Sequence, residues 1–85
     1  MKNNVNRENI TRHLLEYQLK MVDKTIEETL SDDNWFFNWT ITNNQHEEFK
    51  KYAIPLLKKI FKFNKTRAEN TFQWFNLAYG LRIKN

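Results

Sequence analysis

Apolar residues recur at steps of three and four through most of the chain, a spacing typical of amphipathic helices. The clearest run begins after Thr42. Its apolar positions share one side of a helix, and its lysines fall on the opposite side. This segment therefore predicts a helix with an apolar inner side and a basic outer side. The apolar positions are Phe49, Tyr52, Ala53, Leu56, Leu57, Ile60 and Phe61.

The start of this helix carries a recognisable signal, and its middle carries a contrary one. Thr42 and Gln45 are spaced as a capping box, in which each side chain bonds to the other residue's backbone N–H. Pro55 removes one backbone N–H and crowds the preceding turn. Because the apolar positions keep their phase across Pro55, we expect either one kinked helix or two helices that meet there.

A second helix is predicted over residues 65–79. Asn64 and Thr66 both suit its N-cap, and Thr66 with Glu69 is spaced as another capping box. Gly80, the single glycine of the chain, predicts a left-handed residue that ends this helix. The apolar positions that define its inner side are Ala68, Phe72, Phe75 and Tyr79.

The first part of the chain predicts a helix from near Arg7 with two apolar stripes, roughly 100° apart or more. A helix that is apolar on two sides is either central to its own domain or packed on a second chain. Thr25 and Glu28 are spaced as a third capping box. Because the first stripe stops at Met21, we favour a break there over one helix that continues to Leu30. One stripe is Ile10, Leu14, Tyr17 and Met21. The other is Leu15, Leu19 and Val22, with Ile26 and Leu30 added if the helix continues.

Residues 35–41 fit two structures. Trp35, Phe37 and Trp39 alternate with other residues as in a strand, whereas a helix would stack Trp35 on Trp39. A strand needs a partner, and only residues 81–84 offer one. The capping residues of the preceding turn favour a short helix, with Asp32 or Asp33 as its cap.

Composition supports a helical protein. With one glycine, one proline and no cysteine in 85 residues, we expect an all-α fold, a small single-domain bundle of three to five helices with a central helix kinked near Pro55. The domain spans residues 1–85, and the polar residues 1–6 are expected to be disordered. Neither a secretory signal nor a membrane span is evident, so we expect a cytoplasmic protein. The side chains expected to be mostly buried are Leu14, Tyr17, Phe49, Leu56, Ile60, Phe72 and Phe75.

Catalytic and metal-binding patterns are absent from the sequence. His13 and His46 have no partner at metal-ligand spacing, and we expect both to be solvated helix residues. Ser31, the only serine, lies in a capping turn. The adjacent carboxylates point to different sides of a helix, so they form no acid–base pair. We therefore expect neither an enzyme nor a cofactor, metal or small-molecule substrate.

Charge is strongly segregated along the chain. Residues 1–49 contain five basic and nine acidic residues, whereas residues 50–85 contain nine basic residues and one acidic residue. The basic part is either a solvated lysine-rich side or a surface that binds polyanions. The candidate polyanion-binding residues, expected along one flank, are Lys51, Lys58, Lys59, Lys62, Lys65 and Arg67.

A second set of residues suggests contact with another protein. Trp74 and Leu77 leave the inner side of the last helix, and the first helix has its second stripe. The leading hypothesis is a non-enzymatic protein–protein interaction module, most simply a homo-oligomer. The alternative is nucleic-acid binding through the basic helical side. The composition is typical of AT-rich genomes, such as those of low-GC bacteria or their phages. The candidate oligomer patch consists of Leu15, Leu19, Val22, Trp74, Leu77 and Leu81.

Overall fold

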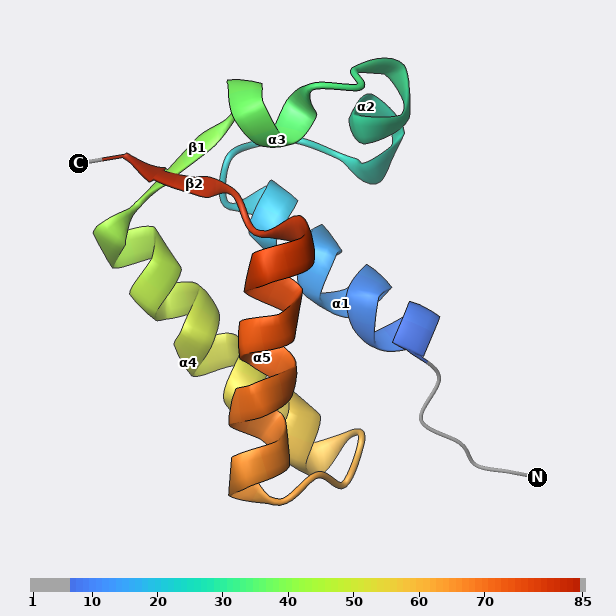
Figure 1. The fold of residues 1–85 in the computed structure, drawn as a ribbon, viewed down its shortest axis with the longest axis vertical. Helices are drawn as coiled ribbons and strands as arrows, with labels where there is room; N and C mark the ends of the chain where they lie inside the picture. Colours follow the sequence, from blue (N-terminus) through green and yellow to red (C-terminus); the bar gives the residue numbers. More distant parts are fainter. Residues whose placement is uncertain (1–6, 85) are drawn as a thin grey trace.

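Three long helices form the body of the molecule, and the shorter elements gather at one end of it (Figure 1). The computed structural model describes residues 7–84, so the expectation for residues 1–6 lies outside the described residues. α4 and α5 run antiparallel, and α1 packs against both. The predicted all-α fold is confirmed, with five helices and one short strand pair in residues 7–84. In chain order the elements are α1 (Arg7–Lys20), α2 (Ile26–Ser31), α3 (Trp35–Asn38), β1 (Thr40–Thr42), α4 (Asn43–Lys59), α5 (Lys65–Tyr79) and β2 (Arg82–Lys84).

An aromatic cluster fills the space between the long helices. The Phe49 side chain is fully buried, and its ring centroid lies 5.2 Å from that of Phe72 and 5.7 Å from that of Phe75. Aromatic rings at such separations pack favourably beyond the area they bury. Among the expected core residues, Leu14, Phe49, Phe72 and Phe75 are buried, and Tyr17 and Leu56 are half-buried.

Ile60 departs from the predicted core. Its side chain is 60% exposed, so the expectation that it is buried is wrong. α4 ends at Lys59, and the chain turns through Lys62, which has a φ of 61°. The Phe63 amide then donates to the Leu57 carbonyl at 3.1 Å. This turn leaves Ile60 outside and places Phe63 in the core in its stead.

Two of the predicted capping boxes are present. The Thr42 hydroxyl accepts from the Gln45 amide at 3.1 Å, and the Gln45 side chain accepts from the Thr42 amide at 2.9 Å. Thr25 and Glu28 make the same reciprocal pair at the start of α2. Gln45 also donates to the Met21 carbonyl at 3.0 Å, which ties the start of α4 to the end of α1. α1 ends at Lys20 and α2 begins at Ile26, so the favoured break after Met21 is confirmed.

Pro55 lies inside α4, which is one helix rather than two. A proline at this position deprives the Lys51 carbonyl of its helical N–H donor. Lys51 is exposed, so water can donate to that carbonyl instead.

The two ends of α5 differ from their predicted signals. Asn64 is the N-cap, because its side chain accepts from the Arg67 backbone N–H at 2.8 Å. The prediction of a capping box that begins at Thr66 is wrong. Gly80 has φ −68° and ψ 142°, so its predicted left-handed conformation is also wrong. The chain leaves α5 in an extended direction toward β2. Glycine suits this exit because a Cβ there would lie 2.5 Å from the Asn76 carbonyl oxygen.

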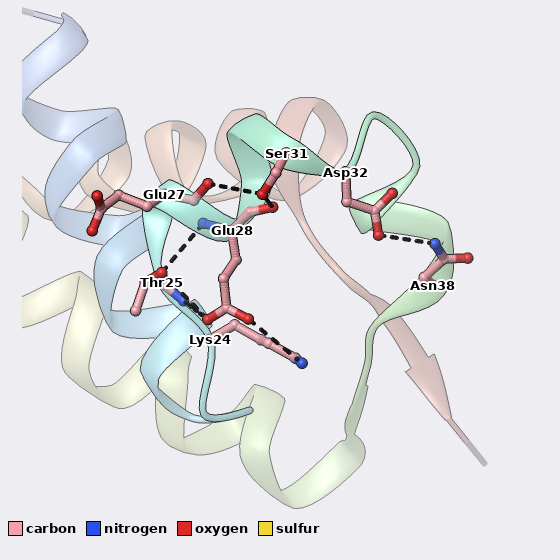
Figure 2. Close-up of polar contacts among 7 residues, drawn as sticks. All are labelled: Lys24, Thr25, Glu27, Glu28, Ser31, Asp32 and Asn38. Carbon is pink, nitrogen blue, oxygen red and sulfur yellow. Dashed lines mark hydrogen bonds and ion pairs between the residues drawn. The ribbon is translucent and has the colours of Figure 1, made fainter.

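Residues 35–42 contain both structures that the sequence allowed. The favoured short helix is present as α3, and a strand, β1, follows it. β1 pairs in parallel with β2, so that Ile41 lies opposite Ile83. Neither predicted aspartate caps α3. Its N-cap is Asn34, whose backbone N–H donates at 2.9 Å to the carboxylate of Asp32. That carboxylate also accepts from the Asn38 side chain at 3.1 Å, closing the turn around α3 (Figure 2).

Gln18 fixes the corner between α5 and β2. Its side chain is only 2% exposed. Its amide nitrogen donates to the Tyr79 carbonyl at 3.1 Å, and its amide oxygen accepts from the Leu81 backbone N–H at 3.2 Å. A buried amide costs little when its hydrogen bonds are satisfied. These two bonds from α1 hold the chain where β2 begins.

Candidate functional site

The polar side chains around α2 serve local structure. The Glu28 carboxylate accepts from Thr25 and lies 3.8 Å from the Lys24 ammonium group. The Ser31 hydroxyl donates to the Glu27 and Glu28 carbonyls (Figure 2). Each of these contacts completes a helix end or turn, and none brings a nucleophile beside a base.

Neither histidine belongs to a candidate metal site. His13 is exposed and lies edge-on to Phe61, with ring centroids 5.9 Å apart. His46 is half-buried beside Phe72 at the same separation. Within residues 7–84, no group of three or more His, Cys, Asp or Glu residues is placed to hold a metal ion.

The basic candidate residues gather around the connection between α4 and α5, at the end of the molecule opposite α2 and α3 (Figure 1). All six side chains are exposed. We call the five residues nearest the connection the basic tip. The sixth, Lys51, lies two turns before Lys58 on α4. Among the described residues, ion pairs join Arg12 to Glu16 and Lys24 to Glu28, and neither includes one of the six. The basic tip consists of Lys58, Lys59, Lys62, Lys65 and Arg67.

The arrangement of these cations along one flank stays a prediction, and helix geometry favours it more for α4 than for α5. On α4, Lys51 and Lys58 project within about 20° of each other. On α5, Lys65 and Arg67 are two residues apart and therefore project about 160° apart. Arg67 is exposed, and its guanidinium lies 4.0 Å from the centre of the Phe63 ring.

The predicted oligomer patch does not form one surface. Leu19 is fully buried and Leu81 is 6% exposed, so the assignment of both to an exposed patch is wrong. Leu19 is covered because the second stripe of α1 packs within its own chain, and the Gln18 contact draws Leu81 inward. Leu15, Val22 and Trp74 are half-buried, and Leu77 is 90% exposed.

Sequence reasoning missed three exposed apolar side chains on α2 and α3. Leu30 is 79% exposed, Phe37 is 56% exposed and Phe36 is 40% exposed. Helical spacing would add Leu30 to the second stripe of α1 only if that helix continued. The break before α2 removes that stripe's continuity, and it leaves Leu30 facing outward.

Comparison with models of protein families, with curated proteins and with solved structures finds no match to this chain. Within residues 7–84, no helix combines the length and the apolar character needed to cross a bilayer.

Proposed function

We propose that this protein is a non-enzymatic nucleic-acid-binding protein that uses the basic tip and Lys51 to contact phosphates. The observation that carries this proposal is the exposure of all six cations, without an ion pair to any described carboxylate. Side chains in this state lose few existing contacts when they approach a polyanion.

The arrangement of the cations favours contacts to the backbone over contacts to base edges. Lysines neutralise phosphates and release condensed counterions, whatever the base sequence. The six residues are divided among α4, the connection and α5, so no single helix presents all of them to a groove. Binding should therefore tolerate changes in sequence.

Affinity for duplex DNA is expected to weaken steeply with salt. If four to six phosphates are contacted, the log–log slope of the association constant against salt should be about −4 to −5. Fluorescence anisotropy with two labelled duplexes of unrelated sequence measures this slope. A slope near zero, or affinity for only one of the duplexes, would argue against the proposal.

Self-association, the hypothesis favoured by the sequence, is the second candidate function. The supporting observation is the exposure of Leu30, Phe36 and Phe37 on neighbouring elements, because exposed apolar side chains that gather in a patch often mark contacts between proteins. The acidic neighbours of these residues, Glu27 and Asp33, complement the basic tip of a second copy.

Sedimentation velocity tests this second function. An assembly heavier than one chain is expected at micromolar concentration, and Leu30→Ser with Phe37→Ser should return it to the monomer by removing apolar contact area. Leu77→Ser is the matched control, because Leu77 is also strongly exposed but lies on α5. A wild-type monomer at high concentration would remove this candidate, and disruption by Leu77→Ser alone would move the interface to α5.

A further inference from the structure

A groove of about 550 Å³ lies between the start of α1 and the first half of α5. This volume is within the range of small-ligand sites in proteins. Its apolar lining includes Ile10 and Phe63, which are almost fully buried, and the half-buried Trp74. The groove thus has a fixed apolar base.

Two arginines border this groove, and each is held against an aromatic ring. The Arg67 guanidinium lies 4.0 Å from the centre of the Phe63 ring, and the Arg7 guanidinium lies 4.9 Å from the centre of the Trp74 ring. A guanidinium interacts with a ring through its planar face, and in that arrangement its N–H donors point outward within the plane. The donors therefore stay available to an anion, and part of the side-chain ordering is already complete.

The remaining polar lining is neutral. Asn70 and Thr71 contribute an amide and a hydroxyl group, and no carboxylate lines the groove. Two cations without an acidic neighbour at the same cavity favour an anion that accepts several hydrogen bonds. Phosphate oxygens meet this requirement, and arginine binds them in a bidentate manner.

We propose that Arg7 and Arg67 clamp one phosphate of a bound nucleic-acid strand in this groove. This inference rests on the proposed function, because the strand is the ligand that the basic tip would bring there. The groove and the basic tip are continuous: the lining residue Phe63 follows Lys62, and Arg67 belongs to both. A strand held by the lysines at neighbouring phosphates therefore reaches the groove without a second binding event.

The test is a titration of the isotope-labelled full chain, followed by two-dimensional NMR. One probe is inorganic pyrophosphate, and the other is a single-stranded oligothymidylate. Both should shift the Trp74 indole N–H signal and the amide signals of Asn70 and Thr71. The oligonucleotide should do so at lower concentration, because the lysines add phosphate contacts. Tighter binding of pyrophosphate would overturn the assignment to a strand.

Substitutions show whether the two arginines act together. Arg7→Gln and Arg67→Gln should each weaken oligonucleotide binding about tenfold, and the combined loss should be less than the product because both contact one phosphate. The matched control is Arg12→Gln with Arg82→Gln, which removes the same charge elsewhere. Arg82 also lies over a ring, 6.0 Å from the centre of Phe37. Equal losses in the two double variants would overturn the clamp.

The two proposals fail in different ways. If the oligonucleotide binds while the Trp74 signal stays unchanged, the proposed function stands and the groove is not its phosphate site. If the oligonucleotide does not bind at low salt, but pyrophosphate shifts Trp74 in the wild type and not in the Arg7/Arg67 variant, nucleic acid is excluded and the groove takes a free phosphate compound.

Discussion

Phe49→Ala is expected to lower the free energy of unfolding by about 3–5 kcal/mol, the usual cost of truncating a buried phenylalanine. Phe49 has no exposed surface, and its ring packs on those of Phe72, Phe75 and Tyr17. Its removal leaves a cavity that involves α1, α4 and α5 together. A domain of this size has little stability in reserve, so much of the variant should be unfolded at room temperature.

Urea denaturation followed by circular dichroism measures this loss. Phe37→Ala is the matched control, because it removes the same side chain from a position that is 56% exposed. That substitution should change stability by less than about 1 kcal/mol. Comparable destabilisation by the two substitutions would mean that the aromatic cluster around Phe49 is not the centre of the core.

Local signals in the sequence predicted much of the fold. The capping boxes at Thr42 and Thr25 depend on residues three positions apart, so a short stretch of sequence was enough to propose them. The apolar spacing correctly placed Phe49, Phe72 and Phe75 inside for the same reason. Helix periodicity is a property of one segment, and it holds wherever that segment stays helical.

The errors arose at the ends of α4 and α5, where the chain leaves a helix. Ile60 kept the helical phase, but the turn at Lys62 ends that phase and buries Phe63 in its place. Gly80 fitted a left-handed helix end, yet the bonds between Gln18 and the α5–β2 corner direct the chain into an extended path. No sequence window contains both Gln18 and Gly80, so their relation emerges only from the packed structure.

The candidate site was predictable in part for the same reasons. A run of seven basic residues without an acid, from Lys50 to Arg67, reliably indicated exposed cations. These cations come together at one end of the molecule because the chain turns back between α4 and α5. The contribution of Arg7 could not be foreseen, because it lies near Trp74 only through the packing of α1 on α5.

Reversal of charge at the basic tip tests the central claim most directly. Lys58→Glu with Lys62→Glu lowers the formal net charge from +4 to 0. Lys20→Glu with Lys84→Glu causes the same change at exposed positions away from the tip. Loss of two phosphate contacts, together with the new repulsion, should weaken nucleic-acid binding by about 100-fold or more at low salt. Because all four lysines are exposed, the helix content of both variants should equal that of the wild type.

The deciding measurement is a mobility shift of a labelled duplex by these three proteins at low salt. The account predicts a strong shift with the wild type, a moderately weaker one with the Lys20/Lys84 variant and none with the Lys58/Lys62 variant. Equal shifts with the two variants would contradict a role for the tip. If the wild type gives no shift, and the Lys58/Lys62 variant instead loses an assembly seen by sedimentation, the basic tip joins copies of the chain and does not bind nucleic acid.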